Sequence, residues 1–320
     1  MTNTKRTTQS RTQSTTQPDG VTTGYADVHD ARLYYEMAGT GETVVFLHAG
    51  IADRRMWDTQ FYNFAKDYQV LRYDIRGYGN STVGEAAYVH AQDLYLLLRA
   101  LDIETATLVG CSLGGTTALD FALEQPTIIK ALVLVNAVPS GFDYTGAMPP
   151  TLQAFVGACQ TGNLAQAAEL ATQLWLDGPQ RRPDQVDADL RAQVRTMIGE
   201  VLATGAVDFT GAHAAAQPAL DRLAEITVPT LVIVGAQDDE SIQRAGDLLV
   251  DRIPAADWTK IERTAHLPSL ERPDAFDRIL FDFLQRIEEI DETISREDSL
   301  ATGLGGAVPR KVVAPRPEDQ

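Results

Sequence analysis

The sequence has little cysteine and no long apolar run. It contains two cysteines, Cys111 and Cys159, which are too few for a disulfide framework or a cysteine-rich metal cluster. No stretch has the length and apolar character of a membrane span, and residues 1–20 lack the apolar core of a secretory signal. These absences predict a protein of a reducing compartment without a membrane span, and we expect it in the cytoplasm.

Basic residues are also in the minority. Lys and Arg number 27 against 44 Asp and Glu, so the formal net charge is −17 at pH 7. A surface of this sign repels nucleic acid and anionic lipid, and we therefore expect neither as a partner. With 320 residues, the chain can bury a full core, and its length permits one large α/β domain or two modest ones. Nothing in the composition fixes an oligomeric state.

The centre of the sequence is a Gly-x-Ser-x-Gly motif at Gly110–Gly114. The apolar run Ala106–Val109 before it predicts a buried strand, and the alanine-rich segment Thr116–Leu123 after it predicts a helix. A serine on so sharp a turn is held in strained backbone geometry, with its hydroxyl exposed above the sheet edge. Ser112 is therefore a candidate nucleophile. The N–H of Leu113, at the helix N-terminus, is a candidate donor to an oxyanion.

Strand and helix patterns alternate through the body of the chain. This alternation predicts the α/β fold class, with a mostly parallel central sheet flanked by helices. Further strands are expected at Gly24–Val28, Arg32–Glu36, Thr43–Leu47, Val70–Asp74, Lys130–Val135, Pro229–Gly235 and Asp257–Ile261. Further helices are expected at Val89–Leu101, Ile242–Ile253 and Asp274–Ile290.

The strand pattern is interrupted once. Residues 141–225 contain only helical patterns, at Thr151–Thr161, Leu164–Leu176 and Asp187–Thr204. We predict an all-helical lid here, inserted between two strands of a core formed by residues 21–140 and 226–290. The polar composition of residues 1–20 and 291–320 predicts disordered tails.

Three predicted strands end in residues that can act together on an acyl group. Ser112 follows one strand, Asp238 lies just past Pro229–Gly235, and His266 follows the last strand. Serine needs a base at neutral pH, imidazole suits that role, and a carboxylate can fix its tautomer. We therefore predict a catalytic triad of these three residues. Asp239 is a second candidate for the acid, although the spacing from the strand favours Asp238.

Five short motifs together resemble the α/β-hydrolase fold family, over about residues 21–290. They are an oxyanion loop (His48-Ala49-Gly50), an Asp-x-Arg-Gly-x-Gly-x-Ser loop (Asp74–Ser81), the nucleophile elbow (Gly110–Gly114), the acid turn (Gly235–Asp238) and the histidine loop (His266 with Glu271–Pro273). Within the family, the segment from His48 to Trp57 and the helical lid are most similar to the subgroup of 3-oxoadipate enol-lactonases and small esterases.

The resemblance implies further site residues. Family members donate a second backbone N–H to the oxyanion from the loop that contains Ala49, where glycine is usual. The donor is therefore Gly50 or Ile51, and motif position favours Gly50. A serine at the elbow excludes the carboxylate nucleophile of haloalkane dehalogenases and epoxide hydrolases. Cys111, one residue before the apex, is expected to point into the core.

The predicted function is a serine hydrolase that cleaves an ester or lactone of a small, apolar molecule through an acyl-enzyme, without metal or cofactor. Two alternatives stay open. One is a C–C bond hydrolase, lyase or cyclase that acts on a biosynthetic intermediate with the same triad, and the other is a small-molecule sensor with little turnover. Arg54 and Arg55 could clamp a carboxylate, but we expect them on a solvated surface. We expect Asp74 and Arg76 to pair with each other and with neighbouring backbone, and so to fix the loop that contains them.

Overall fold

The computed structural model describes residues 12–16, 20–144, 148–205, 207 and 213–303. The other positions, which include parts of both expected tails and of the expected lid, lie outside the described residues. The chain divides into two compact units, Met1–Leu280 and Phe281–Gln320, and the division falls inside the last helix. The candidate site lies entirely in the first unit.

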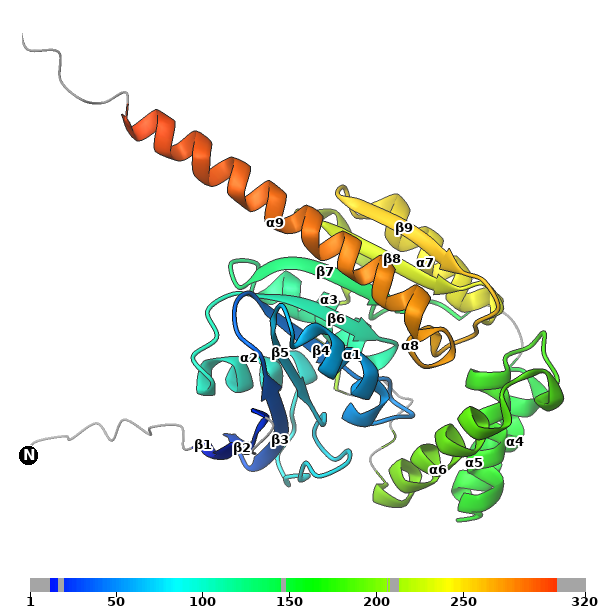
Figure 1. Ribbon diagram of the computed structural model, residues 1–320. Coiled ribbons are helices and arrows are strands. Elements are labelled where there is room, and N and C mark those ends of the chain that lie inside the picture. The colour runs from blue at the N-terminus through cyan, green and yellow to red at the C-terminus, as the bar shows by residue number, and fades with distance from the viewer. Residues whose placement is uncertain (1–11, 17–19, 145–147, 206, 208–212, 304–320) are drawn as a thin grey trace, which may run out of the picture. The chain divides into compact units, whose positions relative to one another are not determined.

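Within the described ranges, nine strands form one sheet in the order β1-β2-β3-β5-β4-β6-β7-β8-β9 (Figure 1). Strands β1 to β3 and β5 pair antiparallel, and β5, β4 and β6 to β9 pair parallel. The predicted fold class, a mostly parallel sheet, is thus confirmed. The bounds are β1 (Thr12–Thr16), β2 (Thr22–Val28), β3 (Ala31–Ala38), β4 (Thr43–Leu47), β5 (Gln69–Tyr73), β6 (Ala106–Cys111), β7 (Ile129–Val135), β8 (Thr230–Gly235) and β9 (Ala256–Ile261).

Helices cover both faces of this sheet, which explains the continuous apolar runs of its central strands. In β4, Val45 and Leu47 belong to the buried core that includes residues of α2 and α3, whereas the Phe46 ring packs on Trp57, with the centroids 5.0 Å apart. The bounds are η1 (Arg54–Trp57), α1 (Asp58–Phe64), α2 (His90–Ala100), α3 (Leu113–Glu124), α7 (Glu240–Arg252), α8 (Pro268–Glu271) and α9 (Pro273–Gly303).

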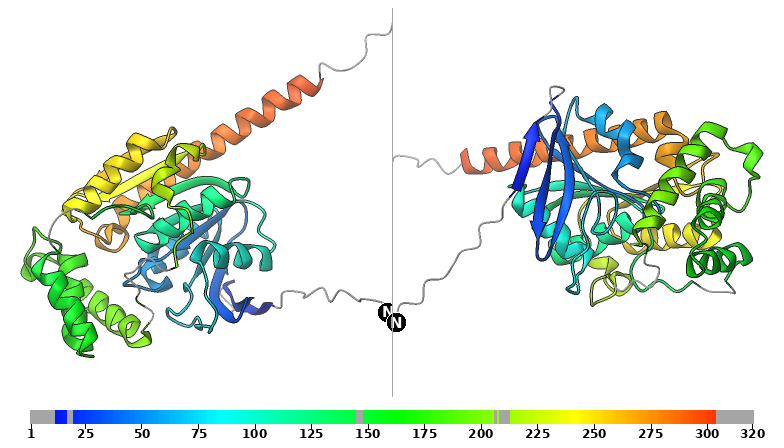
Figure 2. Two further views of the ribbon diagram at one scale, coloured as in Figure 1. Left: turned by 180° about the vertical axis from the view of Figure 1, so that it is seen from behind. Right: turned by 90° about the horizontal axis from the view of Figure 1, so that it is seen from below.

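Between β7 and β8, every regular element that the structure describes is helical. We call this segment the helical insertion. Helix α5 packs against both α4 and α6, and Figure 2 shows the three as one group. Its second expected helix, Leu164–Leu176, changes at Gln173 into a π-helix. The bounds are α4 (Pro150–Gln160), α5 (Leu164–Thr172), η2 (Gln173–Asp177), η3 (Pro183–Gln185), α6 (Ala188–Thr204), η4 (Ala219–Asp221) and η5 (Leu223–Glu225).

The expectation of disordered tails was wrong for two stretches. Thr12–Thr16 forms β1 and pairs antiparallel with β2, because the free edge of β2 offers a hydrogen-bonding ladder and threonine favours extended backbone. Helix α9 continues to Gly303, beyond the expected end at Ile290. No glycine or proline interrupts residues 274–302, and adding a residue to an existing helix is far easier than starting one.

No helix in the described part of the chain is both long and apolar enough to cross a membrane.

Candidate active site

Ser112 stands at the sharp turn between β6 and α3. Its backbone has φ 51° and ψ −113°, in a region that residues other than glycine seldom occupy and that is frequent at functional sites. The turn lies very close to the neighbouring strand, since a Cβ on Gly114 would be 2.3 Å from the Leu47 carbonyl oxygen. Only glycine therefore permits this approach, and the geometry is that expected of a nucleophile elbow.

The loop after β4 faces the elbow. Strands β4 and β6 pair with Leu47 opposite Gly110, so the segments that follow them start at the same level of the sheet edge. A Cβ on Gly50 would lie 3.4 Å from the Leu113 side chain. The N–H of Leu113, the first residue of α3, has no partner within the helix. The N–H of Ala49 donates to Met56 Sδ at 3.2 Å, which leaves Gly50 and Ile51 as the candidate second donors.

His48 holds this loop in place as a neutral side chain. It is fully buried. Its Nδ1 bonds the Ala49 carbonyl oxygen at 2.9 Å, and its Nε2 accepts the Ile75 N–H at 2.9 Å. One nitrogen must donate and the other must accept, which requires a neutral ring protonated at Nδ1. Burial lowers the pKa of His48 and favours the same state. The imidazole thus joins the loops after β4 and β5.

Asp74 anchors the loop after β5, but it does not pair with Arg76 as expected. Its carboxylate accepts the Arg54 N–H at 3.0 Å, the Arg54 guanidinium at 2.8 Å and the Asn80 N–H at 2.8 Å. Burial raises the pKa of Asp74, although Arg54 opposes this shift. Because these three donors converge on Asp74, its carboxylate is committed to holding loops together.

Arg76 points to a different pair of carboxylates. Its guanidinium donates to both Asp93 carboxylate oxygens, at 2.6 and 2.7 Å, and to Asp30 at 2.9 Å. Asp93 lies on α2 and Asp30 in the turn between β2 and β3. The sequence correctly indicated a structural role for Asp74 and Arg76. It could not show that each takes a partner far away in the chain.

The ends of β8 and β9 bring Asp238 and His266 together. These strands pair with Gly235 opposite Ile261, and His266 Nδ1 lies 2.6 Å from Asp238 Oδ2, with both side chains buried. The neighbouring Asp239 instead caps α7 by accepting the Ser241 N–H at 2.8 Å. Of the two aspartates, Asp238 is therefore the one that contacts the imidazole.

Asn136 was not identified from the sequence. It follows β7 with φ 45°, and its side-chain Nδ2 donates to the Ala265 carbonyl oxygen at 2.9 Å while its Oδ1 accepts the Gly235 N–H at 2.9 Å. The elbow is attached to the same strand end, because the Ser112 N–H donates to the Val135 carbonyl oxygen. A buried amide thus links the loops that carry Asp238 and His266. The available signal was an asparagine directly after an apolar strand.

Cys111 is fully buried, as expected, and burial raises the pKa of its thiol. A buried thiol of this kind is unreactive. Its Sγ lies 3.6 Å from the His266 carbonyl oxygen. The residue next to Ser112 therefore contacts the histidine loop, so the elbow and this loop are neighbours in space.

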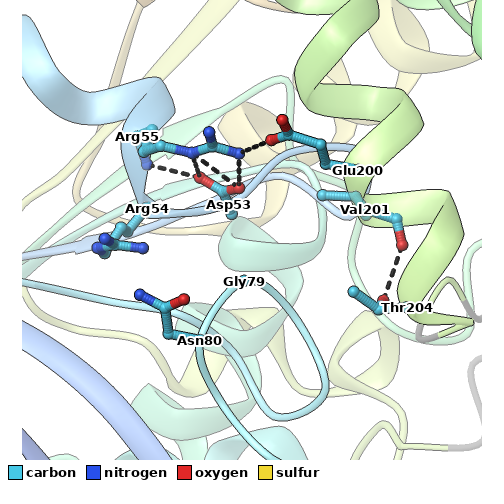
Figure 3. Close-up of a pocket in the computed structure, with 8 residues that line it drawn as sticks. All are labelled: Asp53, Arg54, Arg55, Gly79, Asn80, Glu200, Val201 and Thr204. Carbon is cyan, nitrogen blue, oxygen red and sulfur yellow. Dashed lines mark hydrogen bonds and ion pairs between the residues drawn. The ribbon is translucent and has the colours of Figure 1, made fainter.

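A polar cavity of about 230 Å³ is lined by residues that follow the oxyanion loop in sequence, by the loop after β5 and by α6 (Figure 3). None of Ser112, Asp238 and His266 lines it. Arg54 contacts Glu36 and Asp74, and Arg55 bridges Asp53 at 2.6 Å and Glu200 of α6 at 2.5 Å. Arg54, whose side chain is 13% exposed, is therefore not on the solvated surface expected for it, whereas the Arg55 side chain is 40% exposed. The cavity is lined by Asp53, Arg54, Arg55, Gly79, Asn80, Glu200, Val201 and Thr204.

Potential metal ligands are not clustered in the part of the chain that the structure describes. Among the residues with a described placement, no group of three or more His, Cys, Asp or Glu side chains is arranged to hold a metal ion.

Known proteins resemble this chain over most of its length. The alpha/beta hydrolase fold model matches residues 42–273. The chain is 26% identical over 247 residues to 3-oxoadipate enol-lactonase 1 from Acinetobacter baylyi, covering 77% of this chain and 89% of that protein. It is 30% identical over 272 residues to 2-hydroxy-6-oxononadienedioate/2-hydroxy-6-oxononatrienedioate hydrolase from Paraburkholderia xenovorans, covering 80% and 91%.

A solved structure gives the same result. The crystal structure of the enol-lactonase from Burkholderia xenovorans LB400 superposes with a TM-score of 0.68 at 25% identity, over 82% of this chain and 99% of that one. The predicted resemblance to enol-lactonases is thereby confirmed. The chain belongs to the α/β-hydrolase family, and it is a hydrolase enzyme.

Proposed function

We propose that this hydrolase cleaves an ester or lactone of a small organic molecule through an acyl-enzyme on Ser112. In this mechanism His266 takes the proton of the serine hydroxyl as Ser112 attacks the carbonyl carbon. The resulting imidazolium gives the proton to the leaving oxygen as the acyl C–O bond breaks, which frees the alcohol of an ester or opens the ring of a lactone. Water, activated by the same imidazole, then attacks the acyl-enzyme and restores Ser112.

The contact between Asp238 and His266 is the observation that carries this proposal. At 2.6 Å, Asp238 Oδ2 accepts a hydrogen bond from the N–H of His266 Nδ1 in this mechanism, which keeps the proton on Nδ1 and leaves Nε2 able to act as a base. Both side chains are buried, so a carboxylate here interacts strongly with an imidazolium as it forms. General-base catalysis of this kind contributes roughly 10²- to 10⁴-fold in rate.

The oxyanion is held by two backbone N–H groups in this proposal. Leu113 provides one at the start of α3, and Gly50 provides the other from the loop that faces it. The support is the close approach of Gly50 to Leu113 and the engagement of the Ala49 N–H with Met56. Each such donor typically contributes about 2.7–4 kcal/mol to stabilisation of the transition state.

We infer that the helical insertion serves as the lid and that the substrate is largely apolar. Arg54 and Arg55, the cations nearest to the oxyanion loop in the sequence, each contact two carboxylates. Their charges are therefore already balanced, which disfavours a role as clamps for an anionic substrate. This argues for a neutral ester or lactone.

Cleavage of a carbon–carbon bond is the second candidate. The relative from Paraburkholderia xenovorans is named for hydrolysis of a keto-dienedioate, and the compound in that name has no ester linkage. The same serine and histidine could act next to a ketone in such a substrate. The charge balance at Arg54 and Arg55 favours the ester, because that compound carries two carboxylates.

The test is to treat the purified protein with a fluorophosphonate probe and with p-nitrophenyl esters from acetate to octanoate. Ser112→Ala removes the nucleophile, and Cys111→Ala is the matched control one residue away. We expect labelling and ester turnover in the wild type and in Cys111→Ala, and neither in Ser112→Ala.

The outcomes distinguish the ester hydrolase from the other candidate functions. Turnover that depends on Ser112 establishes the esterase and ranks acyl length. Labelling without ester turnover favours the C–C hydrolase, lyase or cyclase, or the sensor. Absence of both labelling and turnover in the wild type contradicts the serine mechanism.

A further inference from the structure

A short segment of the helical insertion contacts the two loops that carry Asp238 and His266. We call Trp175–Arg181 the brace. It begins inside the π-helix η2, whose last turn is closed by the Gly178 N–H on the Gln173 carbonyl oxygen at 3.0 Å. Helical turns of this type are rare and often occur at functional sites.

The first contact of the brace is with His266 itself. The His266 N–H donates to the Trp175 carbonyl oxygen at 3.0 Å. This bond fixes the backbone of the residue that bears the imidazole, and its acceptor comes from a segment about ninety residues earlier in the sequence. A shift of η2 therefore displaces His266 directly.

The second contact requires glycine. Gly178 has φ +71°, and a Cβ at this position would lie 2.7 Å from the Gln237 carbonyl oxygen and 2.8 Å from the Ala265 Cβ. Gln237 precedes Asp238, and Ala265 precedes His266. The brace backbone thus lies against both loops at once, with no room for a side chain between them.

The third contact is a buried ion pair. Glu271 Oε1 accepts the N–H groups of Ala265 at 2.9 Å and Leu267 at 3.3 Å, the two neighbours of His266. Its Oε2 lies 2.6 Å from a guanidinium nitrogen of Arg181, and the two side chains are only 3% and 10% exposed. One carboxylate therefore holds the backbone on both sides of His266, and a guanidinium from the brace holds that carboxylate.

Arg181 also organises the brace itself. Its guanidinium donates to the carbonyl oxygens of Asp177 at 2.8 Å and Arg263 at 3.2 Å, and to that of Leu176. Arg263 belongs to the histidine loop. A planar guanidinium can make these bonds and the Glu271 pair together, whereas an ammonium has fewer donors in a different arrangement.

We propose that Arg181 and Glu271 are positioning residues that set the location of the His266 imidazole and couple it to the helical insertion. Neither residue reacts with the substrate. Glu271 fixes the backbone around His266, and Arg181 makes that fixation depend on the brace. While the brace makes these contacts, the backbone around His266 is fixed in the position needed for proton transfer. If the helical insertion moves away, these contacts are lost and His266 becomes less well positioned.

This inference deepens the proposed function and rests on it for its kinetic effect. Proton transfer depends steeply on geometry, and displacement of a catalytic group by about 1 Å can cost about 100-fold in rate. Loss of the pair should therefore lower kcat, which depends on His266. It should leave KM nearly unchanged, because the brace residues do not bind substrate in this proposal.

The experiment compares Glu271→Gln, Arg181→Met and Arg181→Lys with Asp93→Asn. The last variant removes an equally buried carboxylate, paired with Arg76, away from the triad. Steady-state kinetics use the best p-nitrophenyl ester, below the melting temperature of every variant. Hydrogen exchange is followed in a peptide covering residues 263–272, which contains the amides of Ala265 and Leu267.

We expect kcat to fall about 10- to 100-fold in Glu271→Gln and Arg181→Met, with KM within about twofold. Arg181→Lys should recover part of the loss, and exchange in the peptide should accelerate in proportion. Asp93→Asn should keep kcat within about twofold even where its melting temperature falls. Equal losses in Asp93→Asn, or unchanged kcat in the brace variants, would overturn the proposal.

Failure of the proposed function gives a different pattern. If the wild type shows neither labelling nor turnover, the serine mechanism is wrong, and the exchange experiment still tests the positioning. Exchange that accelerates in the Arg181 and Glu271 variants but not in Asp93→Asn supports the positioning role, and unchanged exchange in all variants overturns it.

Discussion

The two sides of the candidate site are held in different ways. On the side of the proposed oxyanion donors, which we call the oxyanion side, at the ends of β4 and β5, His48 and Asp74 are buried groups of the core that bond to neighbouring loops of the core. On the side of the proposed acid and base, which we call the triad side, at the ends of β8 and β9, the core supplies Asn136, and the helical insertion supplies Trp175 and Arg181. The buried contacts named here on the oxyanion side come from the core, whereas those on the triad side come from both the core and the insertion.

The two sides should therefore respond differently to mutation. Damage to the oxyanion side should appear first as lost stability, because its polar groups are buried and committed to one another. Damage to the triad side should lower the rate as well as the stability, because its buried bonds also set the position of one imidazole. The following predictions test that division, beginning with the largest effect.

Removal of the acid should have the largest effect. We expect Asp238→Asn to lower kcat roughly 10⁴-fold, because an amide at this position favours the wrong histidine tautomer. Asp239→Asn is the control, since asparagine also caps helices well, and it should retain activity within about twofold. Ester hydrolysis by the two purified variants measures this. Equal losses would show that the contact between Asp238 and His266 does not decide the rate.

On the oxyanion side, Asp74→Ala should cost about 3–5 kcal/mol in unfolding free energy, because it leaves the guanidinium of Arg54 partly buried without one of its carboxylates. Asp58→Ala removes a carboxylate that pairs with Arg72 but is 53% exposed, so it should cost less than about 1 kcal/mol. Urea denaturation gives both values. Similar costs for the two variants would contradict the assigned role of Asp74.

Asn136→Ala should lower both the unfolding free energy and kcat, because Asn136 is a buried core residue that also links the loops of Asp238 and His266. It leaves the Gly235 N–H and the Ala265 carbonyl oxygen buried without this partner. We expect a loss of about 2–4 kcal/mol in unfolding free energy, with a lower kcat, since each unsatisfied group costs about 1–3 kcal/mol. Denaturation and kinetics on one preparation test this, and a variant that loses neither would exclude Asn136 from the site.

Acid should weaken the oxyanion side through His48. The pKa of His48 is lowered in the folded protein, so the unfolded chain binds the proton more tightly. The unfolding free energy should therefore fall as the pH drops below the ordinary histidine value of 6.5 and through the folded pKa. Buried Asp74 and Glu271, whose pKa values are raised, act in the opposite direction.

The measurement must therefore isolate His48. We would compare the urea midpoint from pH 7.5 to 5 in the wild type and in His48→Gln, with His29→Gln as control for an exposed turn histidine. The wild type should lose stability more steeply than His48→Gln over this interval, and His29→Gln should follow the wild type. Parallel curves for all three proteins would disprove a neutral, buried His48.

The smallest effect is expected at the link between the oxyanion segment and α6. Glu200→Gln removes one carboxylate from Arg55, whose side chain is 40% exposed and keeps Asp53. We expect a change below about 1 kcal/mol in unfolding free energy, with kcat unchanged. A large loss of kcat would show that the oxyanion side also depends on the insertion, and would remove the contrast.

Much of this architecture was predictable because it depends on local pattern. The strand Thr43–Leu47 was predicted to the residue, and the turn at Gly110–Gly114 follows from glycine spacing. Asp238 was favoured over Asp239 by its distance from the strand. Continuous apolar runs also implied a parallel sheet covered on both faces, and parallel strands bring their carboxyl ends to one edge, where the site residues meet.

The partners of buried charges were not predictable. Asp74 and Arg76 are two residues apart, yet Asp74 binds Arg54 and Arg76 binds Asp93. The sequence states that such groups need partners, because an unpaired buried charge is very costly. The sequence does not show which side chain, distant along the chain, pairs with each charged group in the folded protein.

Local periodicity and strand ends were thus enough to predict a mostly parallel α/β sheet and the candidates Ser112, Asp238 and His266, while the short motifs carried the resemblance to the α/β-hydrolase fold family. How these residues are held depends on the folded chain, because their partners are far away in the sequence. Asn136, Gly178, Arg181 and Glu271 gain their roles from contacts between segments that only the packed chain brings within hydrogen-bonding distance.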